Sequence, residues 1–131
     1  MRTIAQERAG HALERVNSLL RKPEEFRKLY RSYVDSLGPA IVMNGLGQAL
    51  AVELSAAGSK SDNPHRAVYL NVQSWLCRAD GVSPPAGDLL SAIIEHDEDL
   101  YLHAQAEALS WLEWHKKFCR AYLPAKDGTR E

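Results

Sequence analysis

The chain has 131 residues, of which 45% are hydrophobic and 25% are charged, and its formal net charge is −1. These values are typical of one ordinary globular domain with a core of its own, and the net charge indicates no particular class of partner. No apolar run approaches the roughly 18 residues of a membrane span, and the N-terminal residues lack an apolar signal-peptide core, so we expect a cytoplasmic protein with no membrane partner.

Proline and glycine divide the sequence into about six segments with helical periodicity, and none shows the sustained two-residue alternation of a strand. We predict a first helix over residues 3–20, a second over 23–37 and a third over 39–57. Gly38 follows the second helix and Pro39 opens the third, the usual places for these residues at helix ends. The third helix has little polar face, so we expect it to be central.

The second half of the sequence predicts three more helices. A fourth helix over about 63–79 begins with Asn as N-cap and Pro in its first turn. Ser83-Pro84 is predicted to cap a short fifth helix. The last and longest helix begins at Asp97 or Asp99 and ends at a polar tail from about residue 124.

Together these segments predict an all-α fold, a compact single-domain bundle of about six helices over residues 1–131 with a long C-terminal helix. One face of that helix repeats at three- and four-residue steps, which indicates a buried seam. Its members are Tyr101, Ala104, Ala108, Trp111, His115, Phe118 and Tyr122. We also expect burial of Trp75, Trp111, Leu46 and Leu112.

Two cysteines, Cys77 and Cys119, lie far apart inside helical patterns with no CxxC spacing. This placement favours a reduced, buried pair of thiols over a disulfide or a metal site.

The segment Asn44-Gly45-Leu46-Gly47 contains a Gly-x-Gly pattern, which binds phosphate when a strand precedes it and a helix starts at it. Here the glycines lie within an apolar helical pattern. We therefore interpret Gly45 and Gly47 as positions where a neighbouring helix packs closely.

His96 and Asp97 resemble the doublet of metal-dependent phosphohydrolases, but such sites need further ligands from other helices. An acidic, solvated helix start is the preferred interpretation, and a small metal hydrolase is a third hypothesis for function. His115 lies on the apolar seam, which favours a packed core histidine over a catalytic one. We predict no catalytic residue, no metal site, no cofactor and no enzymatic activity.

Charge is unevenly distributed along the chain. Residues 1–38 carry a net charge of +3 and residues 113–131 a net +2, whereas residues 83–112 contain six acids and no Lys or Arg. Basic side chains at helical spacing can contact the phosphate backbone of a nucleic acid. The candidates are Arg8, Arg15, Arg27, Lys28, Arg31, Lys116, Lys117 and Arg120. The alternative is a solvated face, partly neutralised by Glu113 with Lys117 and by Asp35 with Arg31.

Several segments together resemble a known family. They are Tyr30-Arg31-Ser32-Tyr33-Val34, Pro39-Ala40-Ile41, Asn44-Gly45-Leu46-Gly47-Gln48-Ala49-Leu50-Ala51, Trp75-Leu76, Glu107-Ala108-Leu109-Ser110-Trp111-Leu112 and Lys116-Lys117-Phe118. The pattern is similar to the small helical subunit of the type III-B (Cmr) CRISPR RNA-guided effector complex, and it covers the chain from about Ala5 to Leu123.

This resemblance implies a non-catalytic structural subunit in antiviral defence. Such a subunit stacks along the complex with other subunits, including the repeated backbone subunit and copies of itself, and contacts guide RNA and target RNA. Cleavage of target RNA belongs to the repeated backbone subunit in these complexes. The alternative function is a generic helical protein–protein adaptor without RNA contact.

Overall fold

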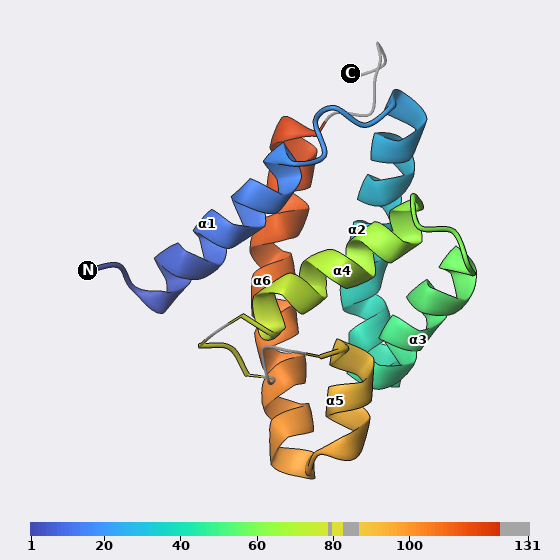
Figure 1. Cartoon of the computed structure of the whole chain (residues 1–131). Helices are drawn as coiled ribbons and strands as arrows, with labels where there is room; N and C mark the ends of the chain where they lie inside the picture. Colours follow the sequence, from blue (N-terminus) through green and yellow to red (C-terminus); the bar gives the residue numbers. More distant parts are fainter. Residues whose placement is uncertain (79, 83–86, 124–131) are drawn as a thin grey trace.

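A computed structural model describes residues 1–78, 80–82 and 87–123, and these residues form six α-helices and no strand (Figure 1). The helices are α1 (Ile4–Asn17), α2 (Glu24–Asn44), α3 (Leu46–Ala57), α4 (Pro64–Leu76), α5 (Leu89–Glu95) and α6 (Glu98–Tyr122). The predicted all-α fold with a long last helix is confirmed, since α6 has 25 residues. Within the described residues, no helix is long and apolar enough to cross a membrane.

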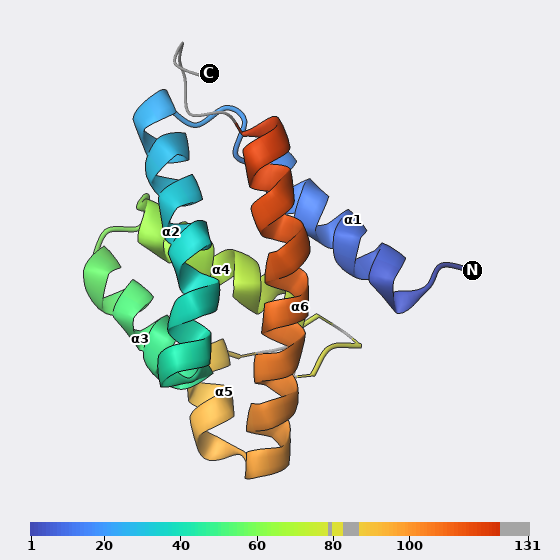
Figure 2. The ribbon, with the colours of Figure 1, turned by 180° about the vertical axis from the view of Figure 1, so that it is seen from behind.

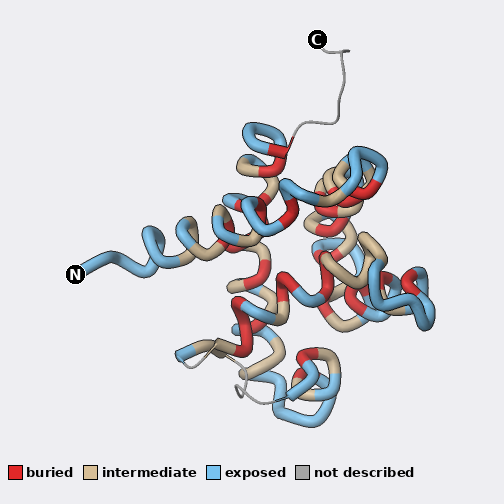
Figure 3. The backbone as a smooth tube through the Cα atoms, turned by 45° about the horizontal axis from the view of Figure 1, so that its top comes forward, coloured by how far each residue is buried: buried red, intermediate tan, exposed pale blue. Residues whose placement is uncertain are grey.

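The long helix α6 is the central element of the bundle. It packs against α1, α2, α4 and α5, while α4 also packs against α2 and α3. Seen from behind, α2 and α6 lie side by side (Figure 2). Buried residues line the inner sides of the helices, and exposed residues lie along their outer sides (Figure 3). The arrangement leaves the outer faces of α2 and α6 on one side of the molecule.

Polar side chains at the helix starts explain where most helices begin, because they accept hydrogen bonds from backbone N–H groups that have no partner within the helix. Thr3 forms a capping box with Gln6 at the start of α1. Asn63 and Asp97 cap α4 and α6, as predicted. Asp88 caps α5, and the predicted cap at residues 83–84 lies outside the described residues.

The predicted boundary between the second and third helices is wrong. Helix α2 continues through Gly38 and Pro39 to Asn44, and the chain breaks at Gly45 instead. Pro39 removes one helical N–H donor, and the glycine before it lacks the Cβ that normally clashes with a proline ring in a helix. Gly45 has φ 90° and ψ 157°, a conformation open to glycine and strained for other residues.

Four large side chains predicted to be buried are buried, namely Trp75, Trp111, Leu46 and Leu112. Both cysteines are buried as well. The third helix was expected to be central because it has little polar face, but part of its apolar surface is exposed, since Val42, Met43 and Val52 are 71%, 82% and 62% exposed. These positions face away from the bundle, on the outer sides of α2 and α3.

Candidate nucleic-acid interface

Six of the eight predicted nucleic-acid contacts lie on two neighbouring helices. Because α2 and α6 are packed side by side, they present these cations together, and we name the set the basic surface. It consists of Arg27, Lys28 and Arg31 on α2 and Lys116, Lys117 and Arg120 on α6. The structure thus brings together two groups of cations that are about 90 residues apart in the sequence.

Helical spacing aligns the cations of each helix. Arg27 and Arg31 are one turn apart on α2, and Asp35 follows at the next turn. On α6, Lys116 and Arg120 are likewise one turn apart. The Nη2 atom of Arg120 lies 3.3 Å from Oδ1 of Asp35, which joins the two rows at their edge.

Two carboxylates neutralise part of the basic surface. Glu113 lies 3.7 Å from both Lys116 and Lys117, so its predicted pairing with Lys117 is confirmed. Asp35 pairs with Arg120 from α6. Ion pairs this exposed contribute about 0–1 kcal/mol, so the cations remain able to exchange these partners for phosphate groups. Arg27 is half-buried, and its Nε atom has no hydrogen-bond partner among the described residues.

The other two candidates, Arg8 and Arg15, are engaged inside the bundle. Arg8 donates through Nε and Nη2 to both carboxylate oxygens of Glu107, at 2.6 and 3.1 Å, and Trp75 donates to the same carboxylate. Burial alone would raise the pKa of Glu107, but the hydrogen bonds from Arg8 and Trp75 outweigh it and hold that pKa below its ordinary value. Arg15 donates to Asn71.

The bond from Arg15 begins a buried chain of hydrogen bonds. Asn71 donates through Nδ2 to the hydroxyl of Tyr30, which lies 2.7 Å from Nε2 of His115. The Nδ1 atom of His115 lies 3.0 Å from the carbonyl oxygen of Ala12. A carbonyl only accepts, so His115 carries its proton on Nδ1 and accepts from Tyr30 at Nε2.

Burial lowers the pKa of His115 to about 3, so this histidine is neutral at physiological pH. Its predicted role as a packed core histidine is confirmed, since it is fully buried and stacked on Trp111. A second histidine, His11, accepts from Nε1 of Trp111 at 2.9 Å. Burial lowers its pKa to about 4, and the cation of Arg15 adds to the effect.

The remaining sequence candidates act as helix ends. His96 bonds through Nδ1 to the carbonyl of Ala92 at the end of α5, and Asp97 accepts from the backbone of Leu100 at the start of α6. Among the described residues, no group of three His, Cys, Asp or Glu side chains is placed to hold a metal ion.

The Gly-x-Gly segment also has a structural role. Gly47 N–H donates to the hydroxyl of Tyr101, and Leu46 N–H donates to Oε1 of Gln105, so side chains of α6 cap the start of α3. A Cβ atom at Gly45 or Gly47 would lie 3.0 or 3.2 Å from the Tyr101 hydroxyl. The predicted close packing against a neighbouring helix is confirmed.

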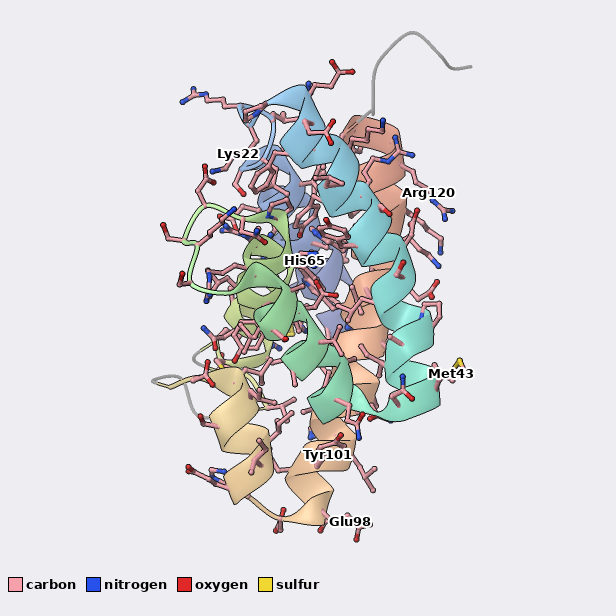
Figure 4. All side chains as sticks on the ribbon, turned by 90° about the vertical axis from the view of Figure 1, so that its right-hand side faces the viewer. Lys22, Met43, His65, Glu98, Tyr101 and Arg120 are labelled. Carbon is pink, nitrogen blue, oxygen red and sulfur yellow. The ribbon has the colours of Figure 1, made fainter. Side chains whose placement is uncertain are left out.

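Three exposed acidic residues gather at one end of the molecule. Glu95, Glu98 and Asp99 are exposed at the turn between α5 and α6. Figure 4 shows Glu98 at this end, and Lys22 and Arg120 toward the other. The cations at that other end share it with the carboxylates of Glu24, Glu25 and Asp62, so the contrast between the ends is a local excess of acid at the turn between α5 and α6.

Comparisons with known proteins agree with this architecture. A model of the CRISPR-associated protein family Cas_Cmr5 matches residues 4–122. The crystal structure of a CRISPR-associated Cmr5 family protein from Thermus thermophilus is similar, with a TM-score of 0.72 and 26% sequence identity. The similarity covers 95% of this chain and 100% of that chain.

Proposed function

Because the chain belongs to the Cas_Cmr5 family of CRISPR-associated proteins, we propose that it contacts the backbones of guide and target RNA as a non-catalytic subunit of a type III-B effector complex. Members of this family are small structural subunits of the Cmr complex, so a place beside the other subunits of that complex in CRISPR defence follows from membership.

The observation that carries the proposed RNA contact is the basic surface. Six cations from α2 and α6 share one side of the bundle, and three of them pair with Glu113 or Asp35 in exposed ion pairs. Cations one turn apart on a helix recur about every 5.4 Å, which allows several of them to reach successive phosphates of one strand. Each phosphate contacted on a single strand makes the slope of log affinity against log salt concentration steeper by about 0.7.

We assign this chain no catalytic step. His96 and Asp97 are used as caps at the ends of α5 and α6, and His115 is buried and neutral. A hydrolytic site needs a base and its partners around an accessible substrate position, and these three residues do not provide one. Cleavage of target RNA is thus assigned to another subunit of the complex.

Copies of the subunit stack in this proposal, and the charges at the two ends of the bundle support a head-to-tail arrangement. Glu95, Glu98 and Asp99 lie at one end, whereas Lys22 and Arg120 lie toward the other (Figure 4), where Glu24 and Glu25 are exposed as well. An excess of acid at one end favours contact with the cations at the other end and disfavours contact between two acidic ends.

Paired alanine substitutions in a rebuilt effector test the RNA contact. One variant removes Arg27 and Arg31, a second removes Lys117 and Arg120, and the matched control removes the exposed cations Arg2 and Lys60 elsewhere. We expect all three to assemble, and we expect the two variants of the basic surface to bind target RNA more weakly with a flatter salt dependence. The control should bind like the wild type.

If both variants of the basic surface keep the affinity and salt slope of the wild type, these cations form only a solvated face. The protein–protein adaptor without RNA contact is then the better account. Loss of assembly by a folded variant supports the same alternative.

A further inference from the structure

Every α6 cation of the basic surface has a carboxylate partner. Glu113 lies 3.7 Å from Nζ of Lys116 and 3.7 Å from Nζ of Lys117, at spacings of three and four residues along the helix. Arg120 pairs across the helices instead, with Oδ1 of Asp35 on α2 at 3.3 Å. Two carboxylates thus hold three of the six proposed phosphate contacts.

The α2 cations of the basic surface differ from those of α6. Within the part of the chain that the structure describes, the ion pairs of the basic surface all involve a cation of α6. Arg31 stands four residues before Asp35, the spacing from which the sequence predicted a pair, but Asp35 reaches Arg120 instead. A phosphate would therefore bind Arg31 without displacing a carboxylate, whereas binding Arg120 requires such an exchange.

The two carboxylates lie at the line where α2 meets α6. Asp35 and Glu113 line one small hollow between these helices, together with Gly38, Pro39 and Lys116. The side chains of Asp35 and Glu113 are 39% and 63% exposed, so solvent and other charged groups reach both. A phosphate that approaches the cations of α6 therefore meets these two negative charges as well.

We propose that Asp35 and Glu113 are internal competitors of RNA, which hold the cations of α6 until phosphate displaces them and so lower the affinity of the basic surface. The inference rests on the proposed RNA contact and adds its regulation. Exposed ion pairs contribute little free energy, so phosphate is able to replace the carboxylates. Each displaced carboxylate is then left beside the strand, and like charges about 5–10 Å apart in water repel by an amount equivalent to a roughly two- to fourfold loss of affinity.

The same exchange predicts a weakened salt dependence. A cation that binds a phosphate of a single strand releases counter-ions from the RNA, which steepens the slope of log affinity against log salt concentration by about 0.7. A carboxylate that loses its protein partner takes up a counter-ion from solution, and this uptake offsets the release. The three paired cations should therefore contribute less to the salt slope of the wild type than unpaired cations would.

Amide substitutions test the competition without removing a cation. Asp35→Asn and Glu113→Gln keep the size of each side chain and break only exposed pairs, so both proteins should fold and melt within a few degrees of the wild type. In a rebuilt effector, each variant should bind target RNA roughly two- to fourfold more tightly at low salt. The salt slope should steepen by up to about 0.7 for each carboxylate removed.

Glu14→Gln is the matched control, because it removes the same charge from an exposed position on α1. This variant should bind target RNA like the wild type. The full-length chain alone, with single-stranded oligouridine as the probe, gives a second measurement in which assembly has no part. We expect the same order of affinities there, with both amide variants above the wild type and the control.

The other results count against the inference in different ways. Amide variants whose affinity and salt slope do not exceed those of the wild type, while Arg27→Ala with Arg31→Ala still weakens binding, overturn the competition and leave the RNA contact standing. Equal tightening by Glu14→Gln assigns the effect to net charge and also overturns it. If no substitution in the basic surface alters target-RNA binding and oligouridine binds none of the chains, the proposed RNA contact fails together with the competition.

Discussion

The hydroxyl of Tyr30 lies 2.7 Å from Nε2 of His115, although the two residues are 85 positions apart in the sequence. Their hydrogen bond joins α2 to α6, the two helices of the basic surface. Asn71 from α4 donates to the same hydroxyl, and Ala12 from α1 accepts from the same imidazole. One buried chain of bonds thus fixes four helices relative to one another, and with them the spacing of the cations outside.

Tyr30→Phe tests this chain of bonds. The change leaves Nδ2 of Asn71 without its acceptor and Nε2 of His115 without its donor, which should lower the free energy of unfolding by about 1–3 kcal/mol. Chemical denaturation measures the effect. Tyr122→Phe removes a hydroxyl from an exposed ring and is the control, with an expected change under about 0.5 kcal/mol. Equal stability of the two variants would show that the buried bonds contribute nothing net.

The histidines predict a loss of stability in mild acid. Burial holds the pKa of His11 at about 4 and that of His115 at about 3, whereas both have ordinary values near 6.5 in the unfolded chain. Below pH 6.5 the unfolded chain therefore binds protons that the folded chain does not, and stability falls as the pH falls toward 4.

We expect the free energy of unfolding to drop by at least about 2 kcal/mol between pH 7.5 and pH 5, as measured by denaturant titration. His115→Gln disturbs the buried hydrogen bonds, so this variant should be less stable than the wild type at pH 7.5. Because one titrating group is removed, its free energy of unfolding should change less with pH. An identical pH dependence in the variant would mean that His115 is not a source of the acid sensitivity.

Gly45→Ala should destabilise the protein by about 1–3 kcal/mol, because the residue has φ 90° and its new Cβ would press on the hydroxyl of Tyr101 that caps α3. Gly10→Ala is the matched control, since Gly10 lies within α1 and its Cβ would meet only Arg2, at an ordinary 3.6 Å. That change should stabilise the helix by roughly 0.5–1 kcal/mol. Melting temperatures that move in the same direction would contradict this account of Gly45.

Head-to-tail stacking predicts a charge-reversal rescue. Glu98→Lys with Asp99→Lys should reduce the number of copies that assemble in an effector, because the two ends that meet between neighbouring copies would then both be basic and repel each other. Glu98→Gln with Asp99→Asn controls for the loss of acids from the first turn of α6. Adding Arg21→Glu and Lys28→Glu to the reversed chain restores opposite charges at the ends and should restore assembly. Failure of this rescue, with a folded protein, would argue against contact between these ends.

The sequence predicted features that depend on neighbouring residues. Asn63 before Pro64 and Asp97 before an amphipathic run are local signals, and both mark helix starts in the structure. The pattern of apolar positions also identified Trp75 and Trp111 as buried. Such features need only the helical period and the chemistry of caps.

Features that depend on distant residues were missed. The Gly38-Pro39 pair is a helix-ending signal, yet α2 continues through it, and Gly45 ends the helix where side chains of α6 cap the next one. The bond between Tyr30 and His115, like the ion pair that occupies Arg8, joins residues too far apart for any local pattern to reveal. In the candidate site, the spacing of the cations along each helix was predictable from the sequence. That the cations of α2 and those of α6 lie on one surface depends on how the two helices pack.

Helix α1 has an unusual position in the order of synthesis. Its contacts from Arg8, His11 and Ala12 reach α6 at separations of 99, 100 and 103 residues. At ordinary elongation rates a ribosome needs roughly 5 to 20 seconds to add about 100 residues, so α1 leaves the ribosome long before the helix it packs on exists. During that interval its apolar face has no docking partner on α6. The bonds that Arg8, His11 and Ala12 make with α6 can therefore form only after nearly all of the helical bundle has been synthesised.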